Sequence, residues 1–171
     1  EQIAHLTSLR GAIFLLIQVA AAPVREDARQ AAAITVKNLI KKRWGEDAVF
    51  GQEPDRMQAR TAVLDALMRS DVTGVVRDTL AEAVNELATR DFPQRWPDLL
   101  PSLLRVVHAK PDPVSVHNAL LALRKVAKRY EYKSFDASNP TGNDATTRGP
   151  LEQLVQQAFP LLRGLLQTVL P

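Results

Sequence analysis

The chain has 171 residues, 46% of them apolar and 24% charged, which is ordinary for one sizeable globular domain and excludes disorder throughout. Cysteine is absent, so disulfides and thiolate chemistry are excluded and an intracellular location is favoured. The formal net charge of +3 does not demand a nucleic-acid partner, and no apolar run approaches the length of a membrane span. Because the first residue is Glu1 rather than Met, we expect a segment of a longer protein.

Helical periodicity and helix-end signals predict seven helices after a short helical remnant at the start of the chain. No stretch shows the alternation of a β-strand. Two connections are notable: a polar loop over Gly45–Glu53, and a long flexible loop over residues 134–149 that contains almost no apolar side chain. Pro160 is expected to bend or split the last helix. The predicted helices are Leu9–Ala22, Val24–Arg43, Asp55–Arg69, Val72–Arg90, Pro97–Ala109, Pro113–Tyr132 and Pro150–Leu170.

The stretch from Arg29 to Trp44, R-Q-A-A-A-I-T-V-K-N-L-I-K-K-R-W, organises the rest of the chain. Apolar residues fall on one side of its helix, where alanines let a neighbouring backbone approach closely. Two interpretations of its basic last turns stay open: the cations complement the helix dipole, or they bind phosphate or an acidic protein face. The expected buried residues are Ala28, Ala32, Leu39 and Ile40, and the cations are Lys37, Lys41, Lys42 and Arg43.

A second notable stretch, D-F-P-Q-R-W-P, covers residues 91–97. Its two prolines forbid a continuous helix, so the chain is expected to turn a corner here. Phe92 and Trp96 are predicted to fill the gap between two helices rather than to form a ligand site.

The spacing of the helices predicts a repeat. Alternate helices begin near Val24, Val72 and Pro113, at intervals of about 48 and 41 residues, and a period of this size with two helices per unit is typical of HEAT solenoids. The predicted fold is therefore all-α, a right-handed α-solenoid of about three and a half HEAT-type repeats. On the pattern alone, an irregular helical bundle stays possible.

Residue patterns that would indicate catalysis are absent from the sequence. There is no Gly-rich phosphate loop, no H-E-x-x-H motif and no nucleophile with an adjacent base. The three histidines, His5, His108 and His117, lie on different predicted helices, so no metal site is expected among them. We therefore expect no enzyme, no cofactor and no metal, and the low aromatic content speaks against a nucleic-acid interface.

Three spaced motifs resemble a known family. Residues 24–44 are similar to the signature of the importin-β amino-terminal domain, and R-D-F-P-Q-R-W-P-D-L-L at residues 90–100 resembles a segment found downstream in these receptors. Y-E-Y-K at residues 130–133, R-G-P-L at 148–151 and F-P-L-L at 159–162 are similar to the branch that contains importins seven and eight. In order, these motifs cover nearly the whole chain.

The resemblance implies an amino-terminal HEAT-repeat domain over residues 1–171, truncated at both ends, of a nuclear transport receptor that shuttles between nucleus and cytoplasm through nuclear pores. It implies binding of the GTP form of the GTPase Ran through inner helices, here Leu9–Ala22, Asp55–Arg69 and Pro97–Ala109, whereas protein cargo and FG-nucleoporins mostly engage later repeats. Neither a membrane nor nucleic acid is an expected partner. The Ran-binding candidates, expected to be exposed, are Gln18, Arg56, Arg60, Asp65 and Arg105. The motif residues given a structural role are Lys37, Asn38, Trp44, Asp91, Phe92, Pro93 and Trp96.

Two rival functions remain. The first is a HEAT scaffold for protein assembly unrelated to Ran, which nucleotide-dependent binding would separate from the leading hypothesis. The second is a basic solenoid that binds nucleic acid through Lys37, Lys41, Lys42 and Arg43, which would require a steep dependence on salt.

Overall fold

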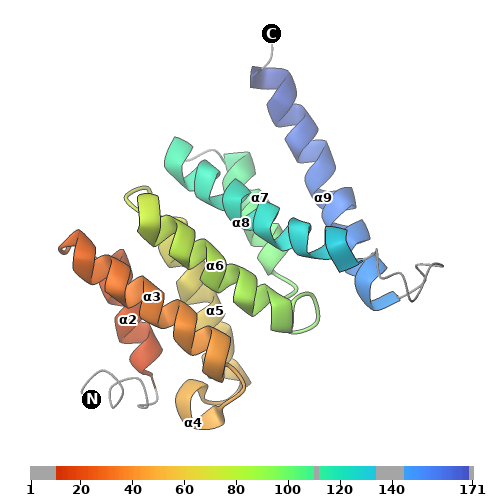
Figure 1. Cartoon of the computed structure of the whole chain (residues 1–171). Coiled ribbons are helices and arrows are strands. Elements are labelled where there is room, and N and C mark those ends of the chain that lie inside the picture. Colours follow the sequence, from red (N-terminus) through yellow and green to blue (C-terminus); the bar gives the residue numbers. More distant parts are fainter. Residues whose placement is uncertain (1–10, 110–111, 134–144, 170–171) are drawn as a thin grey trace.

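A computed structural model describes residues 11–109, 112–133 and 145–169 of the chain. Within these ranges all regular secondary structure is helical (Figure 1). No helix of the described part is both long and apolar enough to cross a bilayer. The helices are α2 (Ala12–Ala21), α3 (Glu26–Arg43), α4 (Asp47–Phe50), α5 (Glu53–Leu67), α6 (Gly74–Asp91), α7 (Leu99–Ala109), α8 (Pro113–Lys133) and α9 (Ala145–Val169).

The long helices form two layers. Helices α3, α6 and α8 lie side by side and run in the same direction, while α2, α5 and α7 lie behind them (Figure 1). Each helix of the second layer packs on the next helix along the chain: α2 on α3, α5 on α6, and α7 on α8. Helix α9 lies against α7 and α8 at one end of the layers. This stacking of helix pairs confirms the prediction of a HEAT-type solenoid.

Small residues contribute to the most extensive contact between two described helices, that between α3 and α6. Ala33 of α3 and Ala81 of α6 are fully buried, and larger side chains such as Ile40 and Leu80 fill the space around them. The alanine-rich pattern therefore predicted close backbone approach correctly. Ala28, however, is exposed, because it lies in the first turn of α3, ahead of the buried stretch that begins at Ala32.

The polar loop predicted over residues 45–53 is wrong in part, since it contains the short helix α4. Val49 and Phe50 are buried, and the Phe50 ring meets the Trp44 ring edge-on with centroids 4.8 Å apart. Two apolar residues in a polar stretch gain a hydrophobic contact and a favourable aromatic geometry by folding back onto Trp44. Gly51, with φ of 72°, then ends α4 in a backbone conformation that disfavours other residues.

The carboxyl-terminal prediction also needs correction. Residues 145–149 belong to α9 rather than to the predicted loop, whose remaining residues, 134–144, lie outside the described part. Pro150 is the sixth residue of α9, so it removes one backbone hydrogen bond inside the helix instead of marking the helix start. Pro160 also lies within α9, which continues to Val169, so the expected split does not occur.

Candidate functional site

The outward side of the α2/α5/α7 layer combines exposed apolar and polar side chains. Leu15 of α2 is 65% exposed and Met57 of α5 is 59% exposed. Three of the predicted contact residues, Gln18 of α2, Asp65 of α5 and Arg105 of α7, are also exposed. The layer therefore brings residues from three separate helices onto a surface that is open to a partner.

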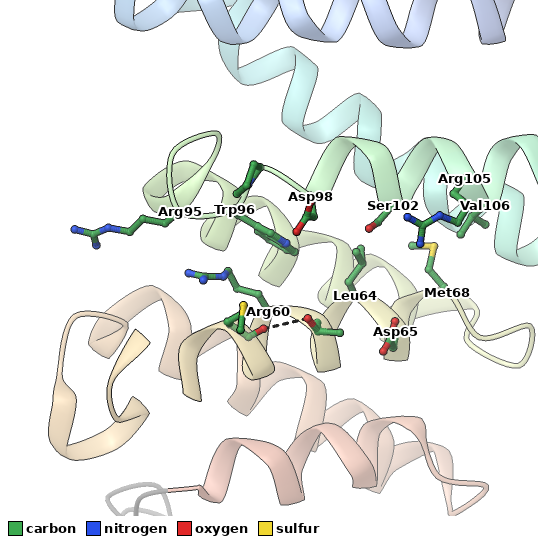
Figure 2. Close-up of a pocket in the computed structure, with 13 residues that line it drawn as sticks. Arg60, Leu64, Asp65, Met68, Arg95, Trp96, Asp98, Ser102, Arg105 and Val106 are labelled. Atoms are coloured by element: carbon green, nitrogen blue, oxygen red, sulfur yellow. Dashed lines mark hydrogen bonds between the residues drawn. The ribbon is translucent and has the colours of Figure 1, made fainter. Parts of the chain in front are cut away.

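A hollow of about 390 Å³ lies between α5 and α7 and is closed at one end by the corner at residues 91–98. Figure 2 shows Arg95 and Arg105 at opposite ends, with Trp96 and Leu64 between them. Trp96 and Leu64 are each 6% exposed, so they form an apolar floor. Asp65, like the two arginines, is exposed and makes no ion pair within the described residues. Such a hollow suits the insertion of side chains from a protein surface.

Arg60 is not an exposed contact residue, which corrects the prediction. It is 2% exposed, its Nη1 donates to Asp91 Oδ2 over 2.7 Å, and its Nη2 is paired with Glu53. Arg60 was predicted to face solvent, but it is a buried cation. A buried charge is stable only when it is paired, and the carboxylates of Asp91 and Glu53 supply that pairing. Charge reversal of Arg56 together with Arg60 is therefore expected to unfold the chain rather than to report on binding alone.

Arg56 is available only in part. Its side chain is 14% exposed, and its Nη2 lies 2.6 Å from Oδ1 of Asp47 in α4. This ion pair ties the start of α5 to α4. Since its guanidinium is already used, we regard Arg56 as a weaker candidate for partner binding than Arg105.

Beneath the hollow, Asp91 joins several motif residues in one buried network. Its Oδ2 accepts hydrogen bonds from Trp44 Nε1 at 2.9 Å and from Arg60, and its side chain is 1% exposed. Its backbone carbonyl accepts from the amides of Arg95 and Trp96 at 2.7 and 3.0 Å, which fixes the corner. Asp91 therefore links α3, α5, α6 and the turn that leads into α7.

The aromatic residues of the corner are buried, as the proposed filling of the gap requires. Phe92 and Trp96 are each 6% exposed, and the peptide bond between Phe92 and Pro93 is cis. The K-N pair of α3 is different: Lys37 is half-buried, whereas Asn38 is exposed, so burial gives no support for a structural role of Asn38.

Among the described residues, no group of three or more His, Cys, Asp or Glu side chains could hold a metal ion. His108 and His117 are exposed on α7 and α8, and His5 lies outside the described part. The hollow likewise contains no nucleophile paired with a base.

Comparison with known proteins places the chain in a family. Residues 1–86 match the family model of the importin-beta N-terminal domain. The chain belongs to the importin-β family. This family consists of nuclear transport receptors, and the finding agrees with the motifs of residues 24–44 and 90–100.

Relatives within the importin-β family are named for both import and export. Exportin-2 of Dictyostelium discoideum is 31% identical over 60% of this chain, and importin-8 of Homo sapiens is 30% identical over 66%. The importin beta-like SAD2 homolog of Arabidopsis thaliana is 29% identical over 78% of this chain. The matched parts cover 11, 11 and 12% of these relatives, respectively. No solved structure matches the chain.

Sequence reasoning missed two buried polar residues of this importin-β domain, both on α8. Asn118 is fully buried, and its Nδ2 donates to the carbonyls of Leu67 and Val72 at 2.8 and 3.0 Å. The Ser115 hydroxyl lies 2.7 Å from the carbonyl of Met68. Both residues hold the end of α5, where helix carbonyls lack intrahelical partners. A signal was present, because both fall on the buried stripe of α8 at helical spacing.

Proposed function

We propose that the chain is the Ran-binding end of a nuclear transport receptor and binds the GTP form of Ran through the α2/α5/α7 layer. Membership in the importin-β family supports the class of receptor. The observation that carries the site is the exposure of Gln18, Asp65 and Arg105 on one layer, the layer that the resemblance assigns to the inner helices.

The chemistry of this layer suits a folded protein partner. Leu15 and Met57 offer apolar area, and the hollow between α5 and α7 offers a pocket for inserted side chains. Asp65 and Arg105 make no ion pair among the described residues, so both charges are free to pair across an interface. Because Asp65 and Arg105 carry opposite charges on neighbouring helices, they would orient a protein partner with complementary charges. They would not form a uniformly positive surface for a polyanion.

The rest of the receptor supplies the other activities in this proposal. The chain aligns with about a tenth of the length of the relatives described above. We assign protein cargo and FG-nucleoporins mainly to parts of the receptor outside these residues, and we place the receptor in nucleus and cytoplasm, passing through nuclear pores. In this role the chain is a binding module and not an enzyme.

The test is calorimetric titration of the chain with Ran loaded with a non-hydrolysable GTP analogue and, separately, with GDP. We expect binding to the GTP form alone. Equal binding to both forms, or binding to neither, would favour the rival function, a HEAT scaffold unrelated to Ran.

A matched pair of variants tests the site. Arg105→Glu reverses a charge on the α2/α5/α7 layer, whereas Arg124→Glu reverses an exposed charge on α8 in the other layer. A central interface arginine contributes more than about 1.4 kcal/mol, so we expect Arg105→Glu to weaken Ran binding about tenfold or more. Arg124→Glu should change the affinity less than about twofold. Equal losses in the two variants would reject the assignment of this layer.

A further inference from the structure

Four described cations of the α3/α6/α8 layer have acidic partners. Ion pairs join Arg29 to Glu26 and Asp71, Arg43 to Glu46, Arg77 to Asp78, and Lys125 to Glu82. Arg124 and Lys128 of α8 are exposed and form no ion pair within the described residues. The same is true of Lys41, Lys42 and Arg90, which lie near the ends of two neighbouring helices. These three residues are called the basic corner below.

The basic corner is formed by the carboxyl-terminal ends of two neighbouring helices. Helices α3 and α6 run in the same direction and end side by side (Figure 1). Arg90, at the end of α6, donates from its Nη2 to the backbone carbonyl of Lys41 over 2.6 Å. This bond places the Arg90 guanidinium at the end of α3, beside the two lysines.

Stabilisation of the end of α3 explains only part of the positive charge of the basic corner. Arg90 caps a carbonyl in the last turn of α3, where intrahelical donors are absent. Among the described residues, the two lysines make no such bond, and like charges at neighbouring helix ends repel one another. The nearby Glu46 is occupied by Arg43, with 2.8 Å between the paired atoms, and Glu86, one turn before Arg90, pairs with none of the three. The corner therefore carries positive charge that the described residues do not neutralise.

We propose that the basic corner binds an acidic segment of a partner protein, an extended run of Asp and Glu side chains. Lysine ammonium groups are flexible point charges that suit single carboxylates. Bases of a nucleic acid would need aromatic side chains to stack on, and the nearby Trp44 and Phe92 are buried. The corner lies on the α3/α6/α8 layer, so an acidic segment and Ran bind to different layers and do not compete for side chains.

The experiment measures fluorescence anisotropy of a labelled peptide of ten alternating Glu and Asp residues, titrated with the whole chain at low and at physiological salt. The test variant is Lys41→Gln with Lys42→Gln. Its control, Arg124→Gln with Lys128→Gln, removes the same charge from exposed positions of α8. Exposed charge contacts are individually weak, so we expect the test variant to weaken binding about five- to tenfold and the control less than twofold.

Three outcomes would overturn the proposal. Equal weakening of peptide binding in both variants would show an effect of net charge alone. In a competition experiment, an unlabelled single-stranded oligonucleotide would indicate a nucleic-acid surface if it displaced the labelled peptide at a lower concentration than unlabelled peptide does. Absence of peptide binding at low salt would also reject it. Circular dichroism of both variants verifies that they are folded. Since the lysine variant leaves the α2/α5/α7 layer unchanged, its affinity for Ran should stay within twofold of the wild type.

Discussion

The buried network around Asp91 makes a sharp stability prediction. In Asp91→Ala, the guanidinium of Arg60 and the indole N–H of Trp44 both lose their acceptor inside the protein. Removing one partner of a buried ion pair costs about 3–5 kcal/mol, and the remaining contact of Arg60 with Glu53 favours the lower half of that range. For a domain of this size, we expect the melting temperature to fall by about 6–16 °C.

Urea unfolding followed by far-UV circular dichroism measures the loss of unfolding free energy. Asp65→Ala is the matched control, because it removes an exposed aspartate that has no ion pair in the described part of the chain, and it should change stability by about 0.5 kcal/mol or less. Coupling is tested by adding Arg60→Met. The double variant should lose about 1–3 kcal/mol less than the sum of the two single variants, since the unpaired cation is then gone. Additive effects, or an Asp91→Ala loss no larger than that of the control, would refute the reasoning.

Three further predictions follow from single contacts. Asn118→Leu should cost about 2–3 kcal/mol in urea unfolding, because it leaves two buried carbonyls unpaired, and a loss under 1 kcal/mol would contradict this role. Gly51→Ala should cost about 1–3 kcal/mol by the same assay, since φ is positive and a Cβ would collide with Asp55; an unchanged midpoint would disprove it. The pKa of Asp112 is lowered, chiefly by the hydrogen bond from the Ser115 hydroxyl, so its contribution is present at neutral pH and is lost as pH falls below about 4. Wild type and Asp112→Asn should therefore differ in urea midpoint at pH 7 and converge near pH 2, whereas a difference independent of pH would exclude this linkage.

The helices were predictable because their signals are local. Apolar residues at helical spacing and prolines at the boundaries located every long helix of the described part, and the alanines of α3 indicated close contact. Helix α4 escaped prediction because four residues are too few to show a period. Val49 and Phe50 of this helix are buried, and the Phe50 ring packs on Trp44, a contact that no local pattern records.

The candidate site was less predictable, because exposure depends on contacts that are distant in sequence. Asp65 and Arg105 were placed correctly on an exposed surface, since their helices have one side without a neighbour. Arg60 is an arginine like Arg105 and lies on the same helix as Asp65, yet it is buried. Its partner Asp91 is 31 positions away, and only the fold brings the two together.

Buried motif residues and exposed contact residues carry different information about this importin-β chain. Motif residues such as Trp44, Asp91 and Trp96 are buried and hold successive helices together, so they identify the family through its architecture. The proposed contact residues, among them Asp65 and Arg105, belong to none of those motifs, and a HEAT solenoid with another partner could keep the motifs and change these two. A motif match can therefore establish what kind of scaffold this is, whereas the choice between Ran and another partner depends on exposed side chains. For that reason the Arg105→Glu comparison is more informative about function than any substitution within the motifs, which would test only whether the scaffold folds.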